Sequence, residues 1–221
     1  MYDLTLVIPA KKEGESLPRV IEELREYNLK KLIVLEKNDL ETINSISDDF
    51  SKIIYQTDKG YGDALIQGIN HVKTKYFCIF NADGSFDPKE LKNMFKRIEL
   101  HQADILFASR YESGSGSEDD TFITRLGNFI FTKIGNIFFK LEITDILYTY
   151  VMGNTDKVKK IDLQSKDFGF CVELPIKAAR MNYKLITSKS FERARISGKK
   201  KVSAFRDGTK ILIKMLNLYF Y

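Results

Sequence analysis

The sequence predicts an α/β protein with a mostly parallel central sheet and helices on both faces. Short apolar runs alternate with longer segments of helical spacing from residue 4 to residue 110, the order typical of parallel strands joined by helices. The runs are apolar nearly throughout, as expected for strands buried on both faces of a sheet. The chain has 221 residues, 43% of them hydrophobic, and can therefore bury a large core. We expect one domain over residues 1–221.

The first half of the chain supplies five expected strands and four expected helices. The strands are residues 4–9, 32–35, 52–55, 76–80 and 103–108, each a short apolar run that stops at a polar or turn-forming residue. The first helix follows Ser16, a residue type that caps helices, and apolar residues recur at helical spacing from Leu17 to Leu24. The other helices are expected at about 40–46, 63–72 and 88–100.

The second half departs from this order. Residues 112–120 are rich in Gly, Ser and acidic residues, which is typical of a mobile loop that closes over a ligand or of a surface linker. Residues 124–140 are helical but apolar almost all round, so this helix is buried or contacts a membrane or a partner. Burial in the core or in a dimer interface is the default expectation.

The end of the chain should contain two more helices and a strand. A helix is expected over residues 168–181, and Pro175 suggests that it properly starts after Glu173. A strand follows at 183–188. Residues 205–221 have the spacing of an amphipathic helix with an aromatic end, which could lie on lipid together with the apolar helix before it.

Asp83 and Asp87 stand in a turn directly after the fourth strand. In an open α/β sheet, ligands bind beyond the carboxyl ends of the strands, where a carboxylate can hold a divalent cation against a phosphate. Asp83 fits that position, and it fits a turn aspartate that supports Gly84 equally well. Asp87 precedes Pro88 and stands three residues before Glu90, which predicts a helix cap with a capping box.

Gly60 and Gly62 precede the third helix. Glycine before a helix lets backbone N–H groups approach a phosphate closely, although turn geometry alone is the interpretation that the residues favour. The Lys-Ser/Thr ending of a P-loop is absent.

Charge and cysteine content narrow the class of protein. The net charge is +5, from 35 basic and 30 acidic residues, and the basic excess gathers in residues 193–201. This suits phosphate groups or an anionic membrane surface, and it is too small for a nucleic-acid partner. Cys78 and Cys171 lie in apolar contexts and should be buried thiols. With no signal peptide and no apolar run near the ~20 residues that span a bilayer, we expect a cytoplasmic protein, with peripheral contact to the cytoplasmic membrane face left open.

A series of short motifs runs along the chain. In order, they are Leu-Val-Ile-Pro at 6–9 with Glu13, Gly-Tyr-Gly-Asp-Ala-Leu at 60–65, Asn-Ala-Asp-Gly-Ser-Phe-Asp-Pro at 81–88, Ala-Ser-Arg-Tyr at 108–111, Thr-Arg-Leu-Gly-Asn at 124–128, Thr-Asp at 144–145, Phe-Glu-Arg-Ala-Arg at 191–195 with Gly-Lys-Lys at 198–200, and Ala-Phe-Arg-Asp-Gly at 204–208. Their order and spacing resemble those of family 2 glycosyltransferases, especially the dolichyl-phosphate mannose synthase-like branch. The resemblance implies a GT-A fold, with a nucleotide-binding half at 1–110 and an acceptor half at 111–221.

The resemblance implies an inverting enzyme that moves a hexose from a GDP- or UDP-linked sugar to a polyprenyl or dolichyl phosphate, using Mg²⁺ or Mn²⁺. The donor-binding residues that it implies are Pro9, Glu13, Glu36, Asp58, Gly62, Asn81, Asp83 and Arg110. Asp83 and Asn81 would hold the metal. Arg125, Arg195 and Lys200 would bind phosphates together with Arg110 during catalysis, and Asp145 is a further catalytic candidate.

The acceptor decides whether a general base is needed. An ionised lipid phosphate is already a nucleophile, whereas a sugar hydroxyl would need a base such as Asp145 or Glu173. Asp145 fits a paired structural carboxylate equally well. Asn81 stands where the family has the first Asp of its Asp-x-Asp region. We therefore keep three hypotheses: transfer to a lipid phosphate, transfer to a saccharide hydroxyl in surface polysaccharide synthesis, and a catalytically silent protein that binds nucleotide sugar.

Overall fold

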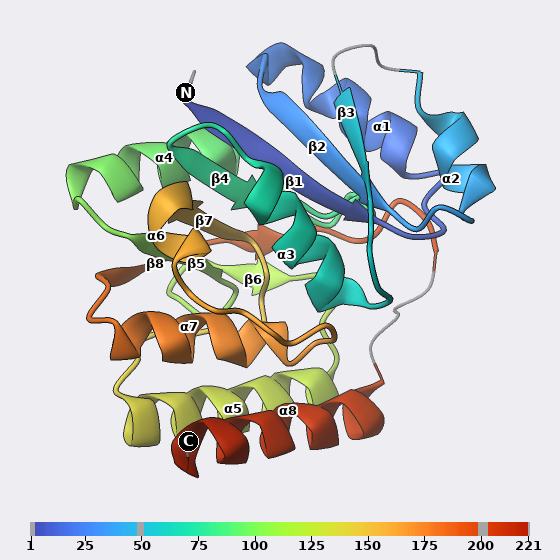
Figure 1. Cartoon of the computed structure of the whole chain (residues 1–221). Coiled ribbons are helices and arrows are strands. Elements are labelled where there is room, and N and C mark those ends of the chain that lie inside the picture. The colour runs from blue at the N-terminus through green and yellow to red at the C-terminus, as the bar shows by residue number, and fades with distance from the viewer. Residues whose placement is uncertain (1–2, 48–50, 199–202, 221) are drawn as a thin grey trace.

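A seven-stranded sheet forms the centre of the computed structural model, which describes residues 3–47, 51–198 and 203–220 (Figure 1). Its strands are β1 (Leu4–Ala10), β2 (Lys30–Leu35), β3 (Ser51–Tyr55), β4 (Tyr76–Ile79), β5 (Ile105–Ser109), β7 (Val151–Asn154) and β8 (Leu185–Lys189), in the order β3-β2-β1-β4-β7-β5-β8. Neighbouring strands are parallel except for β7, which is antiparallel to both β4 and β5. The predicted class and the mostly parallel sheet are confirmed.

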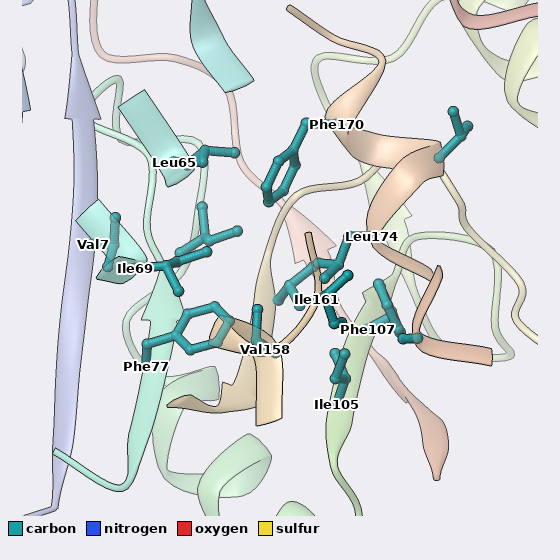
Figure 2. Close-up of a cluster of buried hydrophobic side chains, with 14 of the residues drawn as sticks. Val7, Leu65, Ile69, Phe77, Ile105, Phe107, Val158, Ile161, Phe170 and Leu174 are labelled. Atoms are coloured by element: carbon teal, nitrogen blue, oxygen red, sulfur yellow. The ribbon is translucent and has the colours of Figure 1, made fainter. Parts of the chain in front are cut away.

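Helices cover both faces of this sheet. They are α1 (Leu17–Glu23), α2 (Leu40–Ser45), α3 (Tyr61–His71), α4 (Glu90–Leu100), α5 (Phe122–Phe139), α6 (Thr155–Lys159), α7 (Phe170–Arg180) and α8 (Ala204–Phe220), with a 3₁₀ turn at Arg25–Tyr27. Because side chains alternate along a strand, Leu6 and Ile8 of β1 join the apolar cluster under α1 and α4, while Val7 joins the other. Figure 2 shows this second cluster, where Val7 and Phe77 of two strands lie opposite Phe170 of α7.

Helices α5 and α8 form an outer layer beyond α7 (Figure 1). They lie side by side and parallel, since Gly208 neighbours the Phe131 ring and the Tyr219 ring packs on Phe138 with centroids 5.6 Å apart. Of the α5 residues, Asn128, Thr132 and Gly135 are buried. The expectation that this apolar helix is buried in the core is therefore wrong for its outer face, and a dimer interface or a membrane stays a prediction. None of the helices in the described ranges is long and apolar enough to cross a bilayer.

Two local expectations about helix starts are wrong. Helix α7 begins at Phe170 and contains Pro175, although Pro175 suggested a start after Glu173. A proline at this position removes one hydrogen bond to the carbonyl four residues earlier, and the burial of nearly the whole helix outweighs that loss. At α4, the Glu90 carboxylate accepts the Phe191 N–H at 2.7 Å and forms no capping box. The Asp87 carboxylate accepts the Lys89 N–H at 3.0 Å, just before the helix.

A short second sheet holds part of the acidic loop. It pairs β6 (Gly116–Ser117) with β9 (Phe191–Glu192) in parallel. The loop at 112–120 is thereby attached to the segment that follows β8. This attachment brings two chain segments with opposite charge, Glu118 to Asp120 and Arg193 to Arg195, to one side of the sheet.

Candidate functional site

A cavity of about 400 Å³ opens at the carboxyl ends of the parallel strands. The loops after β1, β2, β3, β4 and β5 build its wall, which is where open α/β sheets bind ligands. The residues expected at the site that line it are Pro9, Glu13, Glu36, Asn81, Asp83, Arg110 and Arg195. Asp58, Gly62, Arg125 and Asp145 do not line it, and Lys200 falls outside the described residues.

Arg195 bridges two carboxylates in the cavity wall. Its Nη1 lies 3.0 Å from Asp83 Oδ2, and its Nε and Nη2 lie 3.2 and 3.1 Å from the Asp119 carboxylate. Asp83 Oδ1 accepts the N–H and the hydroxyl of Ser85 at 3.0 and 2.7 Å. Although burial opposes the charged form, Asp119 and Asp83 raise the pKa of Arg195 above its usual range. The guanidinium is therefore a permanent cation that links the β4 loop to the acidic loop.

Oxygen donors suited to a divalent cation lie on the β4 loop. No group of three His, Cys, Asp or Glu side chains is placed to hold a metal within the described residues. Mg²⁺, however, is commonly held by one or two carboxylates together with substrate phosphates. The Asp83 carboxylate and the Asn81 amide oxygen are such donors, and Asp83 already faces a cation in the form of Arg195. This donor set fits Mg²⁺ or Mn²⁺ if a diphosphate supplies further ligands.

A hydrogen-bond chain fixes the Asn81 side chain. The Tyr61 hydroxyl donates to Asn81 Oδ1 at 3.0 Å and lies 2.7 Å from Thr149 Oγ1. The Tyr61 ring stacks on Phe168 with centroids 5.2 Å apart. Burial raises the pKa of Tyr61 well above its usual range, so its hydroxyl stays a neutral donor. The Asn81 side chain is therefore connected through Tyr61, at the start of α3, to Thr149 before β7.

Arg110 and Asp145 form a buried ion pair beside the cavity. Arg110 Nε and Nη2 donate to the two Asp145 oxygens at 2.8 and 3.0 Å, and the Arg110 N–H donates to the same carboxylate at 3.1 Å. Arg110 Nη1 also reaches Glu192 at 3.1 Å, and the guanidinium lies 4.6 Å from the Tyr148 ring centroid. Burial would lower the pKa of Arg110, but the charge of Asp145 raises it well above its usual range. This geometry favours the structural interpretation of Asp145.

Arg125 lies at the start of α5, outside the cavity wall. Its side chain is 63% exposed, and its Nε is 4.0 Å from Asp120 Oδ2. Asp120 lines the cavity and accepts hydrogen bonds from the Tyr111 hydroxyl at 2.5 Å and from the Thr124 hydroxyl. Arg125 is thus a largely exposed cation beside the cavity, close to the Asp120 carboxylate in the cavity wall.

Glu13 and Glu36 line the cavity after β1 and β2. Glu13 is buried, and its Oε2 accepts the Ser16 hydroxyl at 2.6 Å. Ser16 holds the N-cap position of α1, but its side chain makes this bond in place of a cap. Glu36 pairs with Lys11 at 2.7 Å. Both carboxylates can accept hydrogen bonds from a base or a ribose.

Gly60 and Gly62 are explained by close packing between backbones. A Cβ at either position would lie 2.1 Å from a carbonyl oxygen, that of Lys166 for Gly60 and that of Ser165 for Gly62. Gly60 also has φ +118, and the Asp63 N–H at the start of α3 donates to the Lys166 carbonyl at 3.1 Å. Asp58 lies in the same loop at the surface, where it pairs with Lys166. The glycines of this loop are therefore explained by its packing against the backbone of residues 165–167.

Glu173, the other carboxylate considered as a base, is buried away from the cavity in α7. Its Oε1 lies 2.8 Å from Lys177 and 3.0 Å from Lys214 of α8, and its Oε2 accepts the Ser165 N–H at 2.7 Å. Burial would raise the pKa of Glu173, but the hydrogen bonds from Lys177 and Ser165 lower it to about 2. The group is a strong ionic tie between two helices.

Sequence reasoning missed Tyr61, Asp119, Tyr148 and Thr149 in the cavity wall. Tyr61 stands inside the glycine motif at 60–65 and Asp119 in the acidic loop, so each carried a signal. Tyr148 and Thr149 carried none. They reach the cavity because β7 is antiparallel and begins at the edge where the parallel strands end.

Known proteins resemble the chain over most of its length. It is 24% identical over 194 residues to the undecaprenyl-phosphate mannosyltransferase of Micrococcus luteus, covering 81% of this chain and 79% of that protein. The crystal structure of glucosyl-3-phosphoglycerate synthase from Mycobacterium tuberculosis with UDP has a TM-score of 0.76 at 10% identity, covering 99% of this chain and 80% of that chain. The same enzyme with Mn²⁺, UDP and phosphoglyceric acid has a TM-score of 0.72 at 10% identity, covering 98% and 78%. These structures share the fold, and the expected GT-A fold is confirmed.

A sequence model of the family described as "Glycosyl transferase family 2" matches residues 5–162. The matched segment includes β1 to α6, and with them the cavity wall from Pro9 to Thr149. The expected class of enzyme, a glycosyltransferase, is confirmed, and the chain belongs to glycosyl transferase family 2.

Proposed function

We propose that this glycosyltransferase moves a hexose from a GDP- or UDP-linked sugar to a polyprenyl phosphate, with inversion. One observation carries the proposal: α5 and α8 line the cavity with one side and expose apolar side chains on the other. Thr124 and Asn128 of α5 and Ile211 of α8 belong to the cavity wall. The large apolar residues exposed on the two helices are Phe122, Ile123, Leu126, Phe129, Ile130, Ile137, Phe138, Phe205, Leu212, Ile213, Leu216, Tyr219 and Phe220.

An acceptor with a charged head and a long apolar tail suits this arrangement. The head can enter the cavity while the tail stays with the apolar face or with lipid beside it. The Micrococcus luteus relative is named for a polyprenyl phosphate acceptor, which supports the same choice. A phosphate acceptor also needs no general base. This agrees with Asp145 and Glu173, because both carboxylates are engaged by cations.

The donor diphosphate is proposed to lie against the β4 loop. Asp83 and Asn81 would hold a Mg²⁺ or Mn²⁺ there, and the bound metal would neutralise charge on the leaving diphosphate. Arg195 would exchange its contact with Asp83 for a phosphate oxygen, because a guanidinium between two carboxylates can also bind phosphate in a bidentate manner. Glu13 and Glu36 would face the base and ribose. The Mycobacterium tuberculosis enzyme of the same fold was crystallised with UDP and Mn²⁺, which supports a metal here.

The direct test is sugar transfer by the purified protein. GDP- and UDP-hexoses are offered with farnesyl phosphate, farnesol or a free monosaccharide as acceptor, with Mg²⁺, Mn²⁺ or EDTA. We expect product from farnesyl phosphate and a divalent metal. Product from the monosaccharide alone would favour the second candidate, a saccharide hydroxyl, for which Asp120 in the cavity wall could serve as base. Donor binding without transfer to any of the acceptors would favour a silent family member.

We also propose that the outer face of α5 and α8 lies on the cytoplasmic leaflet. Lys133 of α5 and Lys210 of α8 are the cations that would meet anionic headgroups, whereas Lys214 is held by Glu173. Phe122 and Phe205 are the residues to substitute, because they are 80% and 83% exposed. The double change of both to Ser should weaken co-sedimentation with anionic vesicles, whereas Leu100→Ser on α4, 72% exposed in the protein, should not. Equal sedimentation of all three proteins would remove this face from the proposal.

A further inference from the structure

A buried hydrogen-bond donor without a partner in the described residues belongs to a residue of the cavity wall. Asn128 of α5 is 1% exposed and belongs to the cavity wall. Its Oδ1 accepts the Leu147 N–H at 3.0 Å, which fixes the orientation of the amide because a backbone N–H can only donate. Its Nδ2 has no hydrogen-bond partner within the described residues. The side chain is therefore held rigidly with one end satisfied and the other end, an NH₂ group, unused.

This donor differs from the other unpaired polar atoms of the protein. Of the buried side-chain atoms without a partner in the described residues, only Asn128 Nδ2 belongs to a residue of the cavity wall. Burying an NH₂ group that donates no hydrogen bond costs folding free energy, and such groups in native proteins usually bind a ligand, an ion or a water. Since Asn128 belongs to the cavity wall, an oxygen of a ligand bound there can supply the missing acceptor.

The surroundings of Asn128 indicate which oxygen. Leu147, Phe168 and Ile211 give this side of the cavity an apolar character. Arg125 stands one helical turn earlier on α5, and residues three apart on a helix are neighbours on its surface. A rigid neutral donor between an apolar wall and a cation fits a phosphate that carries an apolar chain.

We propose that Asn128 binds the acceptor, its Nδ2 donating a hydrogen bond to an oxygen of the polyprenyl phosphate headgroup. The inference rests on the proposed function and adds a recognition residue for the acceptor. The donor diphosphate offers the same kind of oxygen, and the affinity measurements below distinguish the two ligands. Asn128 positions the headgroup while its own position is held by Leu147.

The test compares ligand affinities of Asn128→Asp and Asn128→Ala with those of the wild type. The Asp side chain can keep the bond to Leu147, loses the donor and adds a negative charge, while Ala removes the donor without adding charge. We expect the Kd for farnesyl phosphate to rise at least tenfold in Asn128→Asp and severalfold in Asn128→Ala. The Kd values for farnesol and for UDP or GDP with Mn²⁺ should stay within about twofold. Calorimetry measures each, and circular dichroism confirms folding.

Asn136→Asp is the matched control. Asn136 lies on the same helix, and both ends of its amide are satisfied by Ile143, whose carbonyl accepts at 2.8 Å and whose N–H donates at 3.2 Å. It is not part of the cavity wall. This variant should lower the melting temperature and leave farnesyl phosphate affinity unchanged.

Each other outcome overturns a defined part of the reasoning. Equal farnesyl phosphate affinity in the wild type and both Asn128 variants would refute the role of Asn128 and leave the proposed function standing. Loss of nucleotide affinity with farnesyl phosphate affinity retained would assign the Nδ2 group to the donor, against the inference. A wild type that binds nucleotide but no farnesyl phosphate would refute the proposed acceptor and the inference with it.

Discussion

Replacing Asp145 by Asn should damage stability much more than chemistry. Asp145 is 1% exposed, and its carboxylate accepts three hydrogen bonds from Arg110. Removing one partner of a buried pair costs ~3–5 kcal/mol. Arg110 keeps a second carboxylate, Glu192 at 3.1 Å, so the lower end of that range is expected, about 3 kcal/mol. In a chain of this size, 1 kcal/mol shifts the melting temperature by about 2–4 °C, which gives a decrease of roughly 6–12 °C.

The assay combines urea and thermal denaturation with turnover measured well below both melting temperatures. Asp104→Asn is the control, because Asp104 pairs at 2.7 Å with a Lys157 side chain that is 45% exposed, and such pairs contribute under about 1 kcal/mol. We expect Asp145→Asn to melt early and to keep turnover within about tenfold. If it melts like the wild type and turnover falls by several orders of magnitude, Asp145 acts as a general base. A hydroxyl acceptor would then be the better interpretation.

Three further outcomes are expected. Because the pKa of Glu173 is about 2 in the folded protein and 4.5 in the reference state, its stabilisation of about 3 kcal/mol is complete above pH 4.5 and is lost as the pH falls towards 2. Urea denaturation at pH 6 and pH 3 should show this loss in the wild type and not in Glu173→Gln. Gly62→Ala should destabilise by several kcal/mol, since its Cβ would meet a carbonyl oxygen at 2.1 Å, whereas Gly127→Ala, with nothing within 4 Å, should stabilise α5 by up to ~1 kcal/mol in thermal melts. Asp83→Ala should abolish Mn²⁺-dependent UDP or GDP binding in calorimetry, and Asn81→Asp should tighten it; an unchanged affinity in Asp83→Ala would remove the metal from that loop.

The sequence was most informative where structure depends on neighbouring residues. The strands β1 and β4 are almost wholly apolar runs, so residues 4–9 and 76–80 could be placed in the core, and Glu13 and Asp83 after the strand ends. Strand β7 has only four residues, one of them Gly153, and its place between β4 and β5 follows from pairing with both, which no local pattern expresses.

Ion pairing was the second limit. Arg110 meets a carboxylate 35 residues away and Arg195 one 76 residues away, so their partners depend on the whole fold. The spacing of charges along the chain could identify these arginines as candidate phosphate ligands. It could not indicate that each already holds two carboxylates, Asp145 and Glu192 for Arg110, and Asp83 and Asp119 for Arg195.

The position of β7 also governs the order in which the chain can fold during synthesis. Strands β4 and β5 are consecutive in the sequence, but they do not pair because β7 lies between them in the sheet. In the folded protein, every residue of β4 and β5 is buried. A nascent chain that ends at residue 110 contains both strands but lacks β7, the strand that pairs with each of them. Apolar edges of this kind pair with other chains and cause aggregation. Residues 151–154 must be synthesised before β4 and β5 can be joined in one sheet. We therefore expect residues 1–110, expressed alone, to remain in solution only when residues 111–221 are supplied in trans.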